Sequence, residues 1–266
     1  GSGTLTLAGT NTYSGTTTVS AGTLSVASDS NLGSNTVTLA AGSTLEIAGA
    51  TTIDNAISLS GDATVSNLAD ATLSGIISGA NTLTKAGAST LTLSNTNTYA
   101  GTTISAGTLS VAGDNNLGSG TVTLASGSTL AVTGATNIDN TIALTGDATV
   151  STSANATLSG VISGANTLTK AGVSTLTLSN TNTYAGTTVS AGTLSVASDG
   201  NLGSGAVSLA GGTTLAISGA TTIDNAIALA GNATVSTSAN ATLSGVISGA
   251  NTLTKAGVST LTLSNT

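Results

Sequence analysis

The chain has 266 residues and a net charge of −7, yet only 5% of its residues are charged, against about 25% in a typical soluble domain. Its 39% of hydrophobic residues argues against disorder, because disordered segments are poor in the apolar side chains that drive folding. The sequence lacks cysteine, which excludes disulfides and thiolate metal sites. Its three cations are isolated lysines, which excludes the basic clusters of nucleic-acid-binding proteins, and no apolar run reaches the roughly 20 residues of a membrane-spanning helix.

Three copies of one long repeat follow each other along the chain. The segment Thr-Leu-Thr-Leu recurs at 4–7, 90–93, 175–178 and 260–263, and the three lysines at positions 85, 170 and 255 are evenly spaced. The repeats span approximately 4–89, 90–174 and 175–259, and residues 260–266 hold the first strand of the next repeat. We expect one continuous domain over residues 1–266.

Within a repeat, short apolar pairs indicate a regular succession of strands. In the second copy, in chain order, these are Leu91/Leu93, Leu109/Val111, Val122/Leu124, Leu130/Val132, Ile142/Leu144, Val161/Ile162 and Leu168. Most pairs read apolar–small polar–apolar, so their apolar residues face inward, and no window has helical spacing. The intervening pieces are rich in Gly, Asn and Asp, which tolerate the positive φ of tight corners.

A solenoid explains this pattern better than a sandwich or a barrel. No copy has enough large side chains for a core of its own, so each rung must stack on its neighbours to bury its Leu and Val row. Strands of three to five residues with such corners make rungs of about 20 residues, so that about four rungs fill each repeat. We predict an all-β fold: a single-stranded parallel β-helix with essentially no α-helix.

The segment from Leu176 to Val196 resembles the autotransporter-associated β-strand repeat of type V secreted bacterial proteins. The shared pattern is Leu-Thr-Leu, Asn-Thr-Tyr, a glycine two residues on, Thr-Val or Thr-Ile, and Ala-Gly-Thr-Leu. It also occurs at Leu5–Val26 and Leu91–Val111. The resemblance implies a right-handed β-helix in a passenger region, translocation across the outer membrane, and exposure at the bacterial cell surface or release. The resemblance says nothing about a ligand.

The acidic residues do not form the carboxylate pairs that glycosidases need. Ile-Asp-Asn recurs once per repeat, and a Gly-Asp pair of the first two copies becomes Gly-Asn in the third. The residues are Asp54, Asp139 and Asp224 in the first motif and Asp62, Asp147 and Asn232 in the second. A corner accepts Asp and Asn equally, whereas a catalytic acid would not tolerate the exchange. With no histidine or arginine and no calcium-binding nonapeptide, we expect no enzyme, no catalytic residue, no metal site and no cofactor.

The lysines Lys85, Lys170 and Lys255 each follow Thr-Leu-Thr and precede Ala-Gly. We interpret them as charges on exposed strands that discourage lateral aggregation. The alternative is a basic stripe for anionic glycans.

The aromatic residues are three tyrosines, Tyr13, Tyr99 and Tyr184, which are too far apart for a continuous sugar-stacking ladder. We expect each to pack along a corner with its hydroxyl at the surface. Ice binding would need Thr-x-Thr on nearly every rung. The steps between such pairs are irregular, some much shorter and some much longer than a rung, which disfavours that alternative.

The composition favours a structural role as a rigid, polar-coated stalk or fibre segment of a secreted bacterial surface protein. The alternative is an adhesin whose long face binds a host or glycan surface. Neither end has a charged or proline-bearing cap, so we expect continuation of the same chain or end-to-end self-association into filaments. We expect an extracellular or cell-surface location, no nucleic-acid partner and no membrane span in this segment.

Overall fold

A computed structural model describes residues 1–265, and the chain divides into two compact units, Gly1–Ala131 and Val132–Thr266. In each unit short strands follow one another in coils that stack in parallel, and the chain makes about 13 turns. The predicted β-solenoid is therefore confirmed, and three single 3-10 turns are the only helical elements among the described residues. Whether residues 1–266 form one continuous domain stays a prediction.

The first unit contains β1 (Thr4–Leu7), β2 (Thr17–Val19), β3 (Thr23–Val26), η1 (Asp29–Asn31), β4 (Val37–Leu39), β5 (Thr44–Ile47), β6 (Thr51–Ile53), β7 (Ile57–Leu59), β8 (Ala63–Asn67), β9 (Ala71–Leu73), β10 (Ile77–Ala86), β11 (Thr90–Leu93), β12 (Thr98–Ile104), β13 (Thr108–Val111), η2 (Asp114–Asn116) and β14 (Val122–Leu124). The unit boundary falls within β15 (Thr129–Val132).

The second unit contains β16 (Thr136–Ile138), β17 (Ile142–Leu144), β18 (Ala148–Thr152), β19 (Ala156–Leu158), β20 (Ile162–Ser163), β21 (Thr167–Ala171), β22 (Thr175–Leu178), β23 (Gly186–Val189), β24 (Thr193–Val196), η3 (Asp199–Asn201), β25 (Val207–Leu209), β26 (Thr214–Ile217), β27 (Thr221–Ile223), β28 (Ile227–Leu229), β29 (Ala233–Thr237), β30 (Ala241–Leu243), β31 (Ile247–Ser248), β32 (Leu253–Ala256) and β33 (Leu261–Leu263).

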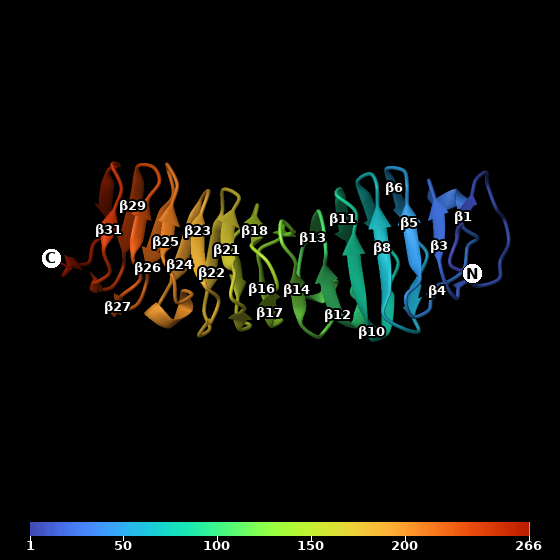
Figure 1. Cartoon of the computed structure of the whole chain (residues 1–266), viewed down its shortest axis with the longest axis horizontal. Coiled ribbons are helices and arrows are strands. Elements are labelled where there is room, and N and C mark those ends of the chain that lie inside the picture. Colours follow the sequence, from blue (N-terminus) through green and yellow to red (C-terminus); the bar gives the residue numbers. More distant parts are fainter. Residues whose placement is uncertain (266) are drawn as a thin grey trace. The chain divides into compact units, whose positions relative to one another are not determined.

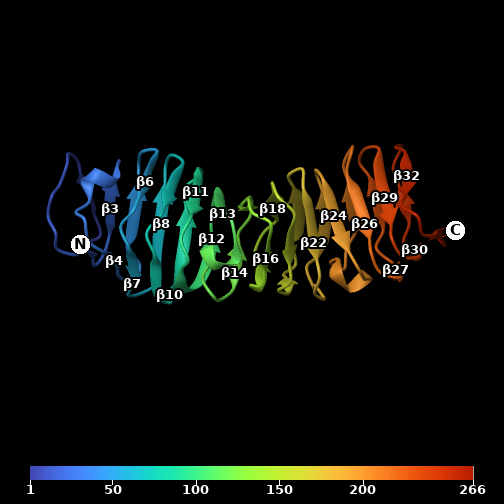
Figure 2. The ribbon, with the colours of Figure 1, turned by 180° about the vertical axis from the view of Figure 1, so that it is seen from behind.

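Strands pair with the strand one turn away rather than with their neighbour in sequence. In the first unit, β1, β3, β5, β8, β10, β12 and β14 form one sheet, which the series β2, β4 and β7 joins at β10, while β6, β9, β11 and β13 form another (Figure 1). In the second unit, β18, β21, β23, β25, β28 and β31 form one sheet and β16, β19, β22, β24, β26, β29 and β32 another (Figure 2). Thr4 pairs with Thr23 and Thr23 with Thr44, so neighbouring turns differ slightly in length.

The core is built by the period-two pattern of the strands. Leu24, Leu45 and Val65 are register partners on β3, β5 and β8, and each is at most 4% exposed. The residues between them on each strand face outward and are mainly Thr and Ser. Each turn thus buries its apolar row against the turns on either side, as the sequence predicts.

Corner asparagines satisfy backbone groups that the short strands leave unpaired. The Oδ1 atom of Asn97 accepts a hydrogen bond from the Ile77 amide at 2.8 Å, and its Nδ2 atom donates to the Asn116 carbonyl at 2.7 Å. Because these partners belong to the turns before and after, each such side chain ties three turns together. Asn182 does the same in the second unit.

One repeat does not equal a whole number of turns. Register partners lead from Leu24 through Leu45, Val65 and Lys85 to Ile104, so four turns end at position 104. The counterpart of Leu24 in the next repeat is Leu109, which lies beyond that point in β13, on a different sheet. Likewise, in the second unit Lys170 lies on the sheet of β21 and Lys255 on the sheet of β32. Each repeat therefore places its residues on another sheet than the repeat before.

In residues 1–265 no helix has the length and apolar character that crossing a membrane requires.

Candidate functional site

The lysine that ends the first repeat is buried, which contradicts the prediction that it is an exposed charge. Lys85 is 0% exposed, and its register partners Val65 and Ile104 are core residues. Its ammonium Nζ donates to three backbone carbonyls, those of Ala86 at 2.9 Å, Gly87 at 2.6 Å and Ala106 at 3.1 Å. The first two acceptors belong to its own turn and the third to the next turn, so the side chain links two turns.

The lysine of the second repeat has the same cage. Lys170 is also 0% exposed, and its Nζ donates to the carbonyls of Ala171 at 2.8 Å, Gly172 at 2.6 Å and Ala191 at 3.0 Å. Lys255 is exposed, and its Nζ donates to the Gly257 carbonyl at 2.6 Å. The interpretation as an exposed charge is therefore wrong for Lys85 and Lys170. A basic stripe formed by all three lysines is wrong, because two of them are buried.

Burial lowers the pKa of Lys85 from its ordinary 10.5 to about 8, although the nearby negative charge of Asp70 acts to raise it. Burial lowers the pKa of Lys170 to about 8 as well. The cause is the loss of water around the ammonium, which disfavours its charged form. The carbonyl cages thus hold a cation inside the apolar column.

The tyrosines were expected to keep their hydroxyls at the surface, and for two of them this is wrong. Tyr99 and Tyr184 are both 0% exposed. The Tyr99 hydroxyl bonds to the Oγ1 atom of Thr102 at 2.9 Å, and Tyr184 repeats this bond with Thr187 at 2.9 Å. Burial raises the pKa of both phenols. Tyr13 makes the same kind of bond, but it is 39% exposed.

A glycine makes room for each buried ring. A Cβ atom at Gly118 would meet the Tyr99 ring at 2.6 Å, and one at Gly203 would meet the Tyr184 ring at 2.6 Å. These contacts are too close for any side chain at either glycine, so the glycine and the ring form one packed unit. No aromatic face of Tyr99 or Tyr184 is available to a sugar.

The aspartates at the Gly-Asp position serve the corners. Asp62 and Asp147 accept hydrogen bonds from the amides of Thr82 and Thr167, each at 2.7 Å. Asn232 in the third copy accepts the equivalent bond from Thr252 at 2.9 Å, so the amide replaces the carboxylate without loss. The predicted corner role is confirmed for this motif.

The Ile-Asp-Asn motif also lies at a corner. The amide of Asp54 donates to Oδ1 of Asp29 at 3.0 Å, and the amide of Asp224 donates to Oδ1 of Asp199 at 3.0 Å. In the part of the chain that the structure describes, no three acidic side chains gather as a metal site would require.

Outward threonines are more regular than the irregular steps of Thr-x-Thr suggested. In the first unit one unbroken row of register partners consists of Thr4, Thr23, Thr44, Thr64, Thr84, Thr103 and Thr123. The neighbouring outward row is mixed: Thr6, Ser25, Glu46, Ser66 and Ala86. The face therefore carries a single threonine ladder and not the paired array that ordered water would need.

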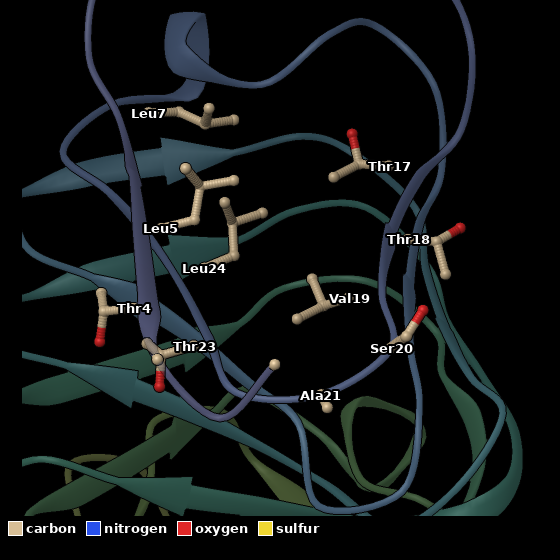
Figure 3. Close-up of a pocket in the computed structure, with 12 residues that line it drawn as sticks. Thr4, Leu5, Leu7, Thr17, Thr18, Val19, Ser20, Ala21, Thr23 and Leu24 are labelled. Atoms are coloured by element: carbon tan, nitrogen blue, oxygen red, sulfur yellow. The ribbon is translucent and has the colours of Figure 1, made fainter.

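A mostly apolar surface depression lies at the first turns. It has a volume of about 490 Å³, and Leu5, Val19 and Leu24 project into it (Figure 3). Val19 in its lining is the counterpart of Ile104, the register partner of Lys85, and Ala21 is the counterpart of Ala106, whose carbonyl accepts from Lys85. The lining is mostly apolar and contains no ionisable side chain, so it has no group suited to acid–base chemistry.

Comparison with protein families identifies the recurring unit. The sequence model of the passenger-associated-transport-repeat family matches residues 1–26, 83–111 and 168–196. The chain carries three passenger-associated transport repeats. The resemblance noted from the sequence is thereby confirmed, and these repeats in a β-solenoid fit an autotransporter passenger region.

The second and third passenger-associated transport repeats contain the complete lysine cage and the buried tyrosine. The match over 83–111 includes Lys85, its three carbonyl acceptors, Tyr99 and Thr102, and the match over 168–196 includes their counterparts. The part of each repeat that defines the family thus holds both kinds of buried polar contact. No curated protein and no solved structure matches the chain.

Two features of the strands explain why Lys85, Tyr99 and Thr102 are buried. Leu83 faces inward, and the period of two places Lys85 on the same side of its strand. On β12, Tyr99 and Thr102 both face inward although they are three residues apart, so the alternation is interrupted between them. The interruption coincides with a shift in the register of the partner strand β10 between Gly79 and Thr82. The sequence shows the first feature directly and gives no sign of the second.

Proposed function

We propose that the chain is a stalk or fibre segment of a secreted bacterial surface protein, located outside the cell or on its surface, with no enzymatic activity. The observation that supports the proposal is that two of the three lysines and two of the three tyrosines are buried and hydrogen-bonded inside the solenoid. Lys85, Lys170, Tyr99 and Tyr184 are fully buried and engaged with backbone or threonine partners. The outward rows are mainly Thr, Ser and small residues, with Glu46 as the one carboxylate in the two rows described above, and they hydrate well.

The mechanism of such a segment is mechanical. Parallel ladders join each turn to the next, and the apolar row of each turn is buried only by its neighbours. Side chains such as Lys85 and Asn97 add bonds between turns. Tension along the stack is therefore resisted at each turn by many bonds that must break together.

The alternative, an adhesive face for glycans, has weaker support. Sugar recognition by aromatic stacking needs exposed rings, and only Tyr13 among the three tyrosines has one. A face that bound glycans would have to use the threonine rows instead. We therefore prefer the structural role.

Electron microscopy of the purified chain over a range of concentrations tests the proposal. Isolated rods with a rung spacing of about 4.8 Å at every concentration would support a stalk segment. Filaments that lengthen with concentration would support a fibre. Irregular particles without a rung repeat would contradict both forms of the proposal.

A further inference from the structure

The basic residues of this chain are few, and two of the three are closed off from solvent. The sequence has no arginine, so Lys85, Lys170 and Lys255 are the only places where a protease specific for basic residues could cut. Lys85 and Lys170 are 0% exposed, whereas Lys255 is exposed. Such a protease must take the lysine side chain into an acidic pocket and must bind the flanking backbone as a free extended segment. Neither condition is met at Lys85 or Lys170.

The side chain of Lys85 is held against the residues that follow the bond to be cut. Hydrolysis would break the bond between the Lys85 carbonyl carbon and the Ala86 nitrogen, and one water would leave a carboxylate on Lys85 and an amine on Ala86. The Lys85 Nζ atom donates to the carbonyls of Ala86 at 2.9 Å and Gly87 at 2.6 Å, the two residues directly after that bond. The side chain cannot enter a specificity pocket until these hydrogen bonds, and the third to Ala106 at 3.1 Å, are broken.

The backbone around each buried lysine is also paired on both sides. On β10, Lys85 is the register partner of Val65 on β8 and of Ile104 on β12. Lys170 lies in the same way on β21, between β18 and β23, and its partner on β23 is Val189. Both ladders must open before the backbone at either lysine can fit an active site. A fluctuation of the side chain alone is therefore not enough for cleavage, and the surrounding turn has to open.

We propose that Lys85 and Lys170 are cryptic cleavage sites, which proteases specific for basic residues cut only after the surrounding turn has opened locally. The enzyme class that fits these sites is a protease with an acidic specificity pocket, and water is the second reactant. Because the three lysines are evenly spaced, cutting after all of them releases the fragments 86–170 and 171–255, each one repeat long. A folded segment stays intact, while an opened segment is removed in units of one repeat. This inference concerns the fold of the chain and does not depend on the proposed function.

Digestion of the whole chain with trypsin, in native buffer and in urea below the unfolding midpoint, tests the proposal, with the fragments identified by mass spectrometry. In native buffer we expect early cutting after Lys255. Cutting after Lys85 should be at least about 1000-fold slower than after the same lysine in a synthetic peptide of residues 78–92, because proteolysis follows the population of the open form. The rates at Lys85 and Lys170 should rise with urea. Cutting after Lys85 in the native chain within about tenfold of the peptide rate would overturn the proposal.

Two matched variants distinguish the opening of one turn from unfolding of the whole chain. Ile104→Ala removes packing beside Lys85, and Val189→Ala removes it at the equivalent place beside Lys170. We expect Ile104→Ala to speed up cutting after Lys85 at least about tenfold with little change after Lys170, and Val189→Ala to favour Lys170 instead. Equal acceleration at both lysines by either variant would overturn local opening. If Ile104→Ala does not fold, Ile104→Val is read in its place beside Val189→Ala, with the same outcomes.

Discussion

At the residue scale, two tyrosines and two lysines are buried and make their hydrogen bonds inside the molecule. Each buried tyrosine meets a buried threonine, and each buried lysine meets three carbonyls. Both kinds of contact occur twice, at equivalent places in the repeats. Because Tyr13 makes an exposed version of the tyrosine pair, the chain contains its own control for the effect of burial.

Tyr99→Phe removes the hydroxyl that bonds to Thr102, which is 1% exposed. The Thr102 hydroxyl then loses its partner in the core, and we expect the free energy of unfolding to fall by about 1 to 2 kcal/mol. Tyr13→Phe removes a bond at an exposed site, where water replaces the partner, and should change stability by less than about 0.5 kcal/mol. Urea unfolding measures both, and equal losses would show that burial does not set the strength of the bond.

Stability should depend on pH through the lysines. Below about pH 8 both the folded and unfolded chains hold the proton, whereas between about pH 8 and 10.5 the unfolded chain binds more protons than the folded one. The free energy of unfolding should therefore rise with pH in this window. Above about pH 10 the raised pKa of Tyr99 and Tyr184 acts in the opposite direction, because the unfolded phenols lose their protons first.

Urea midpoints between about pH 8 and 9.5 isolate the contribution of the lysines. The double variant Lys85→Met with Lys170→Met should lose the rise that the wild-type chain shows. A wild-type midpoint that falls across this window would mean that the cages favour the charged form.

Asn67 is a local defect in the first repeat. Its Nδ2 atom donates to the carbonyls of Ala69 and Thr90, but its buried Oδ1 atom has no partner. Thr237 replaces it in the third repeat, and its hydroxyl donates to the Ser259 carbonyl at 3.0 Å. Asn67→Thr should raise the free energy of unfolding by about 1 kcal/mol, because it removes the unpaired acceptor. The reverse change, Thr237→Asn, should lower the free energy of unfolding. Calorimetry of both variants tests this, and a more stable Thr237→Asn or a less stable Asn67→Thr would contradict the prediction.

At the scale of elements, the strand pattern was predictable because each short strand needs only two inward residues. Leu109 and Val111 on β13 face Leu91 and Leu93 on β11, and all four are at most 1% exposed. The corners were predictable in part, since Asp and Asn were expected to be exchangeable at the Gly-Asp position. The buried lysines and tyrosines were missed because exposure was inferred from residue type, whereas their strands fix the side to which they point.

Leu109→Asp places a charge in the core of its turn. We expect a loss of at least about 3 kcal/mol, because the carboxylate replaces apolar contacts and finds no partner. Amide exchange should accelerate first in β11 and β13, which are paired with each other. Ser110→Asp, on the outward side of the same strand, should change stability by less than about 0.5 kcal/mol. Unchanged thermal unfolding of Leu109→Asp would contradict the inward placement of this residue.

At the scale of the whole molecule, the solenoid followed from composition, because a chain so poor in large side chains can bury its core only by stacking. The number of turns per repeat was predictable only as about four. A repeat is longer than four turns by a fraction of a turn, and the register of the individual strands sets that fraction. Neighbouring turns also differ in length, as the pairs Thr4 with Thr23 and Thr23 with Thr44 show. Such small differences cannot be read from the sequence. This fraction of a turn is what keeps the lysines of successive repeats off a common sheet.

That fraction has a consequence for how such a chain can change during evolution. Duplication or loss of one repeat would lengthen or shorten the solenoid and would also move every later residue onto another sheet. A patch that needs recurring residues side by side on one sheet cannot grow by adding a single repeat, since each copy places its residues on another sheet than the copy before. Selection on length is thereby separated from selection on any one face. A gene that gains or loses repeats by recombination would change the length of the solenoid while its repeated residues stay distributed over several sheets.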